Sequence, residues 1–260
     1  MLMLYFSGTG NSKYIAELFC KQMDTKCHSI EEEINFSNLI TENQTIAFCY
    51  PIYASRPPRI IREFALKHKE SLRGKKIIIF CTQWLFSGDG ARSFTDFFPD
   101  NYIEVLYAEH FLMPNNVSNL FFLPVTQDRR IKKYLTKADQ KMKIVCRNIK
   151  SGVIRKRGFN LISRILGLSQ GTFVPWLEQR TKNSLKINKN CNGCKICIYI
   201  CPVNNLAFKN KKTMPIAMGD CIICYRCVNQ CPKKAITVMF RSKVRRQYKG
   251  IDNHTQNKGE

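Results

Sequence analysis

The sequence predicts an α/β protein built from a doubly wound parallel sheet and a smaller α+β module. Three features of the chain lead to this prediction. An apolar strand, a glycine-containing loop and a helical pattern open the chain, apolar strands alternate with helical stretches through its first half, and two cysteine runs of the same spacing follow near its end. Alternating strands and helices are typical of a parallel sheet, because each crossover helix covers one face of it.

We expect four consecutive segments along the chain. Its 260 residues, of which 44% are hydrophobic, are enough for two modest domains with a real core. Residues 1–150 should form the α/β domain and residues 184–240 the module that contains the cysteine runs. Between them, residues 151–183 make a basic amphipathic connector, and residues 241–260 make a basic tail that we expect to be disordered.

The first loop has the composition of a phosphate-binding turn. Residues 1–6 read as a strand, and Ile15, Leu18 and Phe19 lie on one face of the helix that follows. Glycines let the loop turn its amides inward, hydroxyls add donors, and the amino end of a helix favours a phosphate dianion. The loop lacks the third glycine of a dinucleotide fingerprint and the spacing of a P-loop. Its residues are Ser7, Gly8, Thr9, Gly10, Asn11 and Ser12.

The other strands are predicted at residues 26–30, 45–49, 75–81 and 102–108. Helices are predicted near residues 59–69 and 91–98, with a long amphipathic one within residues 126–150. In a doubly wound sheet a ligand lies beyond the carboxyl ends of the strands, where the strand order reverses. The loops after residues 49 and 81 are therefore expected to meet a ligand. Residues 110–116 are a weaker candidate, for which a plain surface turn is an equal alternative.

These loops resemble those by which flavodoxins hold flavin mononucleotide (FMN). The first loop is similar to the flavodoxin phosphate loop, with a polar loop that holds no ligand as its alternative. The loops after residues 49 and 81 look like the second and third flavodoxin loops. By this resemblance, Tyr53 and Trp84 are the candidates to flank the flavin ring. For each of them, ordinary packing within the protein is the alternative. Beyond the first loop, the implied FMN-binding residues are Pro51, Ile52, Tyr53, Thr82, Gln83, Trp84, Ser87, Gly88 and Asp89.

The two cysteine runs favour iron–sulfur chemistry. Each run has the pattern C-x2-C-x2-C-x3-C-P. A cubane cluster has four iron corners that each take one thiolate, and three cysteines at this spacing can wrap one loop around three corners. A third cysteine two residues on does not suit a zinc ribbon, and disulfides suit exported chains.

The runs resemble those of bacterial two-cluster ferredoxins, in which the fourth cysteine of a run ligates the other cluster. The resemblance implies one 4Fe-4S cluster held by Cys191, Cys194, Cys197 and Cys231. It implies a second 4Fe-4S cluster held by Cys221, Cys224, Cys227 and Cys201. The other five cysteines lack ligand spacing, and we interpret them as buried packing residues.

In their order, the two halves resemble the flavodoxin–ferredoxin fusion proteins of anaerobic microbes. That resemblance implies FMN and two 4Fe-4S clusters in one electron path. We expect intramolecular electron transfer between them, in a redox carrier or a ferredoxin-dependent flavin reductase of anaerobic metabolism. The chain is thus expected to be an oxidoreductase or an electron-transfer protein, and no catalytic residue is assigned. No second nucleotide fingerprint is visible for a nicotinamide donor.

The charge of the chain bears on its partners. The formal net charge is +23, and it falls to about +17 once two clusters and a flavin phosphate are included. Such a field favours acidic redox proteins, such as a ferredoxin, and leaves a small-molecule acceptor open. The alternative function is a basic nucleic-acid-binding protein with structural iron–sulfur clusters, although no recognition motif appears. For the connector, packing between domains is preferred to a membrane surface.

We expect a cytoplasmic location. The apolar start at residues 1–6 has no basic stretch before it and is too short for a signal peptide or a membrane span. Thirteen cysteines without an export signal imply a reducing compartment.

Overall fold

The computed structural model describes residues 1–85, 88–119, 125–208, 214–239 and 242–251. The chain divides into two compact units. The first, here called the sheet unit, comprises Met1–Met113 and Lys132–Val174, and the second, the cysteine unit, comprises Pro114–Ile131 and Pro175–Glu260. The chain therefore passes between its units more than once, whereas the sequence predicts consecutive segments. Within the described ranges, no helix is long and apolar enough to cross a membrane.

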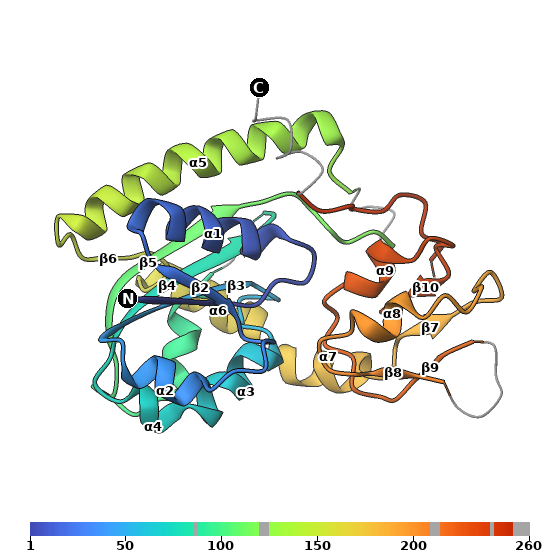
Figure 1. The fold of residues 1–260 in the computed structure, drawn as a ribbon, viewed down its shortest axis with the longest axis horizontal. Coiled ribbons are helices and arrows are strands. Elements are labelled where there is room, and N and C mark those ends of the chain that lie inside the picture. The colour runs from blue at the N-terminus through green and yellow to red at the C-terminus, as the bar shows by residue number, and fades with distance from the viewer. Residues whose placement is uncertain (86–87, 120–124, 209–213, 240–241, 252–260) are drawn as a thin grey trace. The chain divides into compact units, whose positions relative to one another are not determined.

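The sheet unit contains a six-stranded parallel sheet in the order β2-β1-β3-β4-β5-β6 (Figure 1). The chain moves from β1 to β2 on one side and then to β3 on the other, so the strand order reverses at β1 and β3. The predicted doubly wound parallel sheet is thereby confirmed. Its strands are β1 (Leu2–Tyr5), β2 (Lys26–Ser29), β3 (Thr45–Pro51), β4 (Lys76–Gln83), β5 (Glu104–Leu112) and β6 (Arg155–Lys156).

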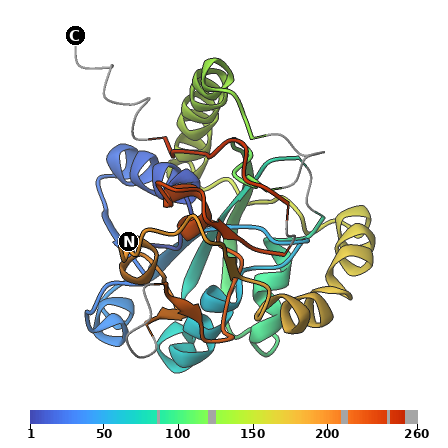
Figure 2. The same ribbon diagram turned by 90° about the vertical axis from the view of Figure 1, so that its right-hand side faces the viewer.

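Helices cover both faces of this sheet. α1 and α5 lie over one face and α2, α3 and α4 over the other (Figure 1 and Figure 2). The helices of this part of the chain are α1 (Asn11–Met23), α2 (Phe36–Thr41), α3 (Arg59–Lys67), α4 (Lys69–Leu72), α5 (Asp128–Lys150) and α6 (Leu161–Gly171), with a short 3₁₀ helix at Arg92–Phe97. A sheet covered on both faces needs apolar strands throughout, which is why Ile77, Ile78, Ile79 and Phe80 of β4 follow one another and are all buried.

Strand β5 is longer than the sequence predicts. It runs to Leu112, so His110 and Phe111 lie in the strand and not in a loop. The polar pair Glu109–His110 does not end the strand, because the buried Glu109 carboxylate lies 2.9 Å from Lys141 Nζ and 3.3 Å from Arg157 Nη1. Burial alone would raise the pKa of Glu109, but these two cations and the His110 amide lower it below its ordinary value.

Part of the predicted connector belongs to the sheet unit. Arg155 and Lys156 pair with β5 as the edge strand β6, and α6 follows directly. Asn160 caps α6, since its side-chain oxygen accepts a hydrogen bond from the Ser163 amide at 2.8 Å.

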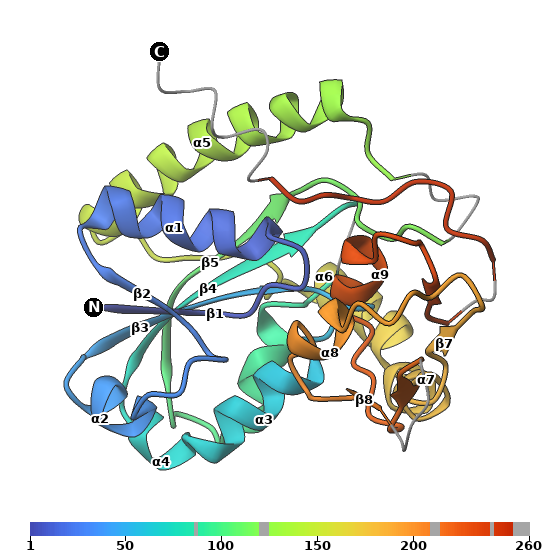
Figure 3. The ribbon, with the colours of Figure 1, turned by 45° about the vertical axis from the view of Figure 1, so that its right-hand side comes forward.

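The cysteine unit consists of two short antiparallel strand pairs and short helices, which confirms its predicted α+β class. β7 (Lys186–Ile187) pairs with β10 (Ile236–Thr237), and β8 (Leu206–Ala207) pairs with β9 (Ile216–Ala217). α7 (Val174–Thr181) precedes them, and α8 (Ile196–Tyr199) and α9 (Arg226–Gln230) lie within the two cysteine runs (Figure 3). A small apolar core forms around Leu185, Val228 and Ile236.

Residues 242–251 are packed, whereas the sequence predicts disorder from residue 241 onward. Val244 and Tyr248 are buried. Gln247 Nε2 donates to the carbonyl oxygens of Val228 at 2.8 Å and Cys231 at 2.7 Å. Widely spaced apolar residues among lysines and arginines gave no recognisable pattern, so tertiary contacts decided the course of this segment. Residues 252–260 lie outside the described part of the chain.

Candidate functional site

The carboxyl ends of β1, β3 and β4 bring the three predicted flavin loops to one edge of the sheet. Backbone hydrogen bonds fix the register of these strand ends. The Phe6 amide donates to the Cys49 carbonyl at 3.0 Å, and the Ile52 amide donates to the Thr82 carbonyl at 3.0 Å. Since the strand order reverses at β1 and β3, this edge is where a doubly wound sheet binds its ligand.

The first loop has the backbone of an anion-binding turn. Gly10 adopts φ +100° immediately before α1, a conformation that disfavours any residue with a side chain, and its amide donates to Ser7 Oγ at 3.1 Å. The first turn of α1 carries no acidic residue. The partial positive charge of the helix amino end is therefore not offset there, so the turn fits a phosphate group.

The side chains of Ser12 and Thr82 contact each other at this edge of the sheet. Both side chains are buried, and their hydroxyl oxygens lie 2.7 Å apart. The Ser12 carbonyl also accepts from Cys49 Sγ at 3.3 Å. These contacts fasten the start of α1 to β3 and β4, and so fix the phosphate turn relative to the second and third loops.

The second loop is a tight turn that leaves an aromatic side chain partly accessible. Tyr53 and Arg56 exchange both backbone hydrogen bonds at 3.0 Å, across Ala54 and Ser55 at φ +45° and +62°. Tyr53 and, in the third loop, Trp84 are each half-buried. Both side chains are thus packed yet accessible, as a residue beside a bound ring must be.

Gly88 and Asp89, two further predicted flavin contacts, lie against α6. A Cβ on Gly88 would fall 2.5 Å from the Gly167 nitrogen. The lack of a side chain at Gly88 therefore lets the third loop pack closely against helix α6. Asp89 is buried, and its carboxylate lies 2.6 Å from Arg92 Nη2. Ser87 lies outside the described residues.

Ser55 holds the second and third loops together, and the sequence did not single it out. Its hydroxyl accepts from the Gly88 amide at 2.9 Å and donates to Gln170 Oε1 at 2.6 Å. Its carbonyl accepts from Ser93 Oγ at 3.0 Å. These partners lie 33 to 115 positions away, so no local pattern could have revealed them.

The two cysteine runs repeat their backbone conformation at an interval of 30 residues. Positive φ values occur in pairs: Gly193 with Ile223 (70° and 56°), Lys195 with Tyr225 (64° and 60°), and Asn204 with Lys234 (50° and 48°). Ile223, Lys195, Tyr225 and Lys234 adopt this backbone although side chains disfavour it. Strained backbone of this kind persists where the surroundings require it, and here it shapes both loops in the same way.

The thiols gather across the two runs. Burial, and after it the neighbouring Cys191, Cys231 and Cys194, raise the pKa of Cys197 to about 11. Burial likewise raises the pKa of Cys224 to about 12, with Cys221 and Cys201 among the groups that affect it. Cys231 of the second run therefore lies near the first run, and Cys201 of the first run near the second. Cys201 and Cys231 are the two cysteines that the resemblance assigns to the cluster of the opposite run.

Backbone amides bond the sulfurs of the two exchanged cysteines. The Asn205 amide donates to Cys201 Sγ at 3.2 Å, and the Ala235 amide to Cys231 Sγ at 3.3 Å, again 30 residues apart. Within the described residues, no three His, Cys, Asp or Glu side chains meet closely enough to hold a single metal ion. A cubane cluster binds its ligands at four separate corners and does not require three of these side chains to meet around one ion.

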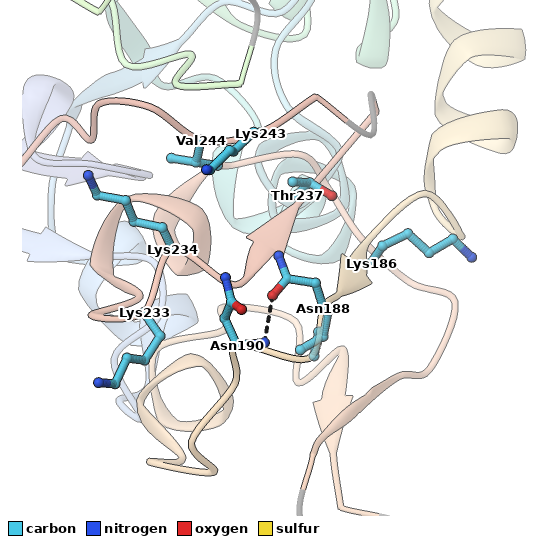
Figure 4. Close-up of a pocket in the computed structure, with 9 residues that line it drawn as sticks. Lys186, Asn188, Asn190, Lys233, Lys234, Thr237, Lys243 and Val244 are labelled. Atoms are coloured by element: carbon cyan, nitrogen blue, oxygen red, sulfur yellow. Dashed lines mark hydrogen bonds between the residues drawn. The ribbon is translucent and has the colours of Figure 1, made fainter.

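A cavity of about 630 Å³ lies beside the cysteine runs (Figure 4). Its walls include Asn190, directly before Cys191, and Lys233, two residues after Cys231. Four lysines line it, and none of the described residues around it is acidic; they are Lys186, Ile187, Asn188, Asn190, Lys233, Lys234, Thr237, Lys243 and Val244. Figure 4 shows Lys186, Lys233 and Lys234 pointing away from one another, so their charges form a rim. This lysine rim was not predicted.

Known proteins match both parts of the chain. The model of the flavodoxin domain family matches residues 2–121, and that of the 4Fe-4S dicluster domain matches residues 190–235. An uncharacterized protein of Methanocaldococcus jannaschii is 31% identical over 75 residues, which are 29% of this chain and 29% of that protein. The matched part thus spans less than a third of that relative.

Among solved structures, the two-electron reduced flavodoxin of Megasphaera elsdenii is 19% identical with a TM-score of 0.38, over 54% of this chain and 99% of that one. A flavodoxin from the domain Archaea is 14% identical with a TM-score of 0.40, over 57% of this chain and 97% of that one. A flavodoxin domain implies FMN, a 4Fe-4S dicluster domain implies iron–sulfur clusters, and both are electron-transfer modules. The sheet topology, the cysteine runs and the two matched families thus show a flavodoxin domain followed by a 4Fe-4S dicluster domain, an order that matches a flavodoxin–ferredoxin fusion and supports a role in electron transfer.

Proposed function

We propose that this protein passes electrons between an external redox protein and FMN by way of two 4Fe-4S clusters. The observation that carries the proposal is the 30-residue repeat, in which ligand spacing, positive φ values and amide-to-sulfur bonds all recur. A bound flavin exchanges one or two electrons and a cluster exchanges one, so together they can convert between paired and single electrons.

Cysteines whose thiols lie close together would ligate the same cluster. The first cluster would take Cys191, Cys194, Cys197 and Cys231, and the second Cys221, Cys224, Cys227 and Cys201. Each set contains two buried thiols, but the first set also contains the exposed Cys194, whereas the other two thiols of the second set are only partly exposed. The first cluster would therefore be the better one to exchange electrons with an external protein, since exposure shortens the path between two proteins.

The flavin phosphate would bind at the turn of Ser7–Ser12, with the Gly10 backbone and the amino end of α1 directed to it. Tyr53 and Trp84 would lie beside the ring, and Pro51, Ile52 and Gln83 would complete its surroundings. Ser12 and Thr82 act by holding the loops in place, because each hydroxyl already has the other as its partner. Gly88 and Asp89 have a similar supporting role through their contacts with α6 and Arg92.

The electron partner is expected to be an acidic redox protein such as a ferredoxin. The lysine rim supports this, because its charges diverge around a cavity next to Cys191 and Cys231. Diverging ammonium groups suit several carboxylates spread over a protein surface better than one compact anion. The missing nicotinamide fingerprint favours a carrier or a ferredoxin-dependent reductase in the cytoplasm of an anaerobic cell.

The proposal is tested on protein purified without oxygen. We expect about eight irons, about eight sulfides and one FMN per chain. Reduced ferredoxin should then reduce the flavin, while NADH and NADPH should not. Re-oxidation only by redox proteins would indicate a carrier, and re-oxidation by a small molecule would indicate a reductase. Colourless protein that retains zinc, or iron-loaded protein without bound FMN, would refute the proposal.

A further inference from the structure

Helix α6 turns its glycines inward and its large aliphatic residues outward. Gly167 and Gly171 are buried in the sheet unit, whereas Leu161, Ile162 and Ile165 are 71%, 70% and 58% exposed. Leu168, one turn further along, is 48% exposed. Helices on the surface of a globular protein normally do the reverse, with aliphatic residues facing the core. Several exposed aliphatic residues side by side mark a surface that binds something.

The contacts of α6 prevent it from rolling to bury these residues. A Cβ on Gly167 would fall 1.6 Å from Asp89 Oδ1, and one on Gly171 would fall 2.7 Å from Arg56 Nε. The side chain of Gln170 accepts the Ser55 hydroxyl at 2.6 Å. The glycine side is therefore fitted closely to the second and third loops, and the opposite side faces away from the sheet unit.

The charge of this segment indicates the chemistry of the surface that α6 binds. Residues 151–174 contain four basic residues and no acidic residue. Arg155 and Arg157 share the Glu109 carboxylate with Lys141, so three cations surround one anion and a positive charge remains. Arg164 lies on α6 among the aliphatic residues and is exposed. An apolar helix face with arginines beside it matches an anionic lipid surface, where the aliphatic chains enter the headgroup boundary and the arginines meet phosphates.

We propose that α6 is a membrane-surface helix, which docks this protein on anionic phospholipid bilayers without crossing them. With 11 residues, α6 is long enough to lie on a bilayer and too short to span it. Leu161, Ile162, Ile165 and Leu168 lie on one face of α6 by helical spacing, and a bilayer can receive such a face without the complementary groove that a protein partner would need. This inference is independent of the electron path and would hold if the proposed direction of electron flow were wrong.

Flotation of the loaded protein with lipid vesicles tests the proposal. The probes are vesicles of phosphatidylcholine alone and vesicles that also contain phosphatidylglycerol. We expect binding to the anionic vesicles, weaker binding at high salt, and little binding to phosphatidylcholine. The double variant Ile162→Gln and Ile165→Gln should bind the anionic vesicles roughly tenfold more weakly. Arg164→Glu should also weaken binding.

The matched control replaces two aliphatic residues of similar exposure elsewhere, Leu66→Gln and Ile144→Gln. This control should bind as well as the unmodified protein, and all variants should retain their flavin and cluster absorbance. Equal loss in the control would overturn the proposal, as would unchanged binding in the α6 variant. If anionic vesicles are not bound but the protein forms dimers that the α6 variant abolishes, the face belongs to a second copy of the chain and the lipid proposal is wrong.

Discussion

The hydroxyl oxygens of Ser12 and Thr82 lie 2.7 Å apart and are buried, although 70 positions separate the two residues. Ser12 lies in the first turn of α1 and Thr82 is the residue before the last of β4, so this hydrogen bond joins the end of the phosphate turn to the start of the third loop. Removing one hydroxyl should leave the other buried without its partner, at a cost of about 1–3 kcal/mol. Ser12→Ala and Thr82→Val are each expected to lower the free energy of unfolding by this amount.

The double variant should cost clearly less than the sum of the two single ones, because the second change removes a hydroxyl that has already lost its partner. Urea unfolding of the four proteins measures this coupling. Additive effects would show that the two hydroxyls act independently. Thr41→Val serves as the control, since the Thr41 hydroxyl bonds only a local carbonyl at the exposed end of α2.

Gly10 is expected to be essential to flavin binding because of its backbone. An alanine at φ +100° should strain the turn by on the order of 1–2 kcal/mol and move the phosphate-binding amides. Gly10→Ala should therefore weaken FMN binding about tenfold or more, as measured by quenching of flavin fluorescence. Gly152→Ala is the matched control: it also has positive φ, but a Cβ there meets only open space. Similar losses of FMN affinity in both would contradict a local role for Gly10.

The fourth cysteine of each run should affect the cluster of the other run. Cys201→Ser is expected to destabilise the cluster held by Cys221, Cys224 and Cys227, and Cys231→Ser the cluster held by Cys191, Cys194 and Cys197. Each variant should lose up to about four of about eight irons, and electron paramagnetic resonance of the reduced protein should show different remaining clusters. Cys146→Ser, in α5, should keep the full iron content. If Cys201→Ser lost the cluster of its own run, the exchange of ligands would be disproved.

Charge reversal at the lysine rim should slow reduction by an acidic ferredoxin. The double variant Lys186→Glu and Lys243→Glu is expected to lower the second-order rate constant roughly tenfold at low salt, because the rim steers the partner electrostatically. The difference should shrink as salt rises. Stopped-flow absorbance measures the rate, and reduction by dithionite should be unchanged. Lys132→Glu with Lys133→Glu, on α5, makes the same change of charge at residues that do not line the cavity. Equal slowing by that pair would point to net charge alone.

The stability of the sheet unit should depend on the protonation of His110. Burial, and after it the positive charge of Arg157, lower the pKa of His110 to about 4, although Glu109 acts in the opposite direction. The folded protein thus keeps His110 neutral while the unfolded chain binds a proton below about pH 6.5. The free energy of unfolding should therefore fall as pH drops from about 6.5 to about 4, by on the order of 2 kcal/mol from this residue.

His110→Gln should remove that part of the pH dependence. The informative quantity is the difference in unfolding free energy between the two proteins at each pH, because the acid sensitivity of the clusters is common to both. A difference that does not vary between pH 4 and 7 would contradict the assignment to His110.

Local patterns in the sequence were sufficient for strands β1 to β4, the phosphate turn and the cysteine runs. Apolar strands of the required length alternate with helices, and Gly10 lies where the backbone needs a positive φ. The spacing of the cysteines indicates that they ligate iron–sulfur clusters. Each of these signals lies within a dozen residues. The pattern therefore predicted the doubly wound sheet, the α+β module and the order of the two domains before any contact was known.

Only the tertiary structure decided which distant residues meet. The partnership of Ser12 with Thr82, the lysine rim drawn from residues 186 to 243, and the packing of residues 242–251 all depend on contacts between segments far apart in the chain. Strand β5 passed through Glu109 and His110 because cations from α5 and the edge strand compensate the buried carboxylate. Sequence periodicity reports which side of an element is apolar, whereas burial depends on what packs against it; this is why the glycines of α6 face inward and its leucines and isoleucines outward.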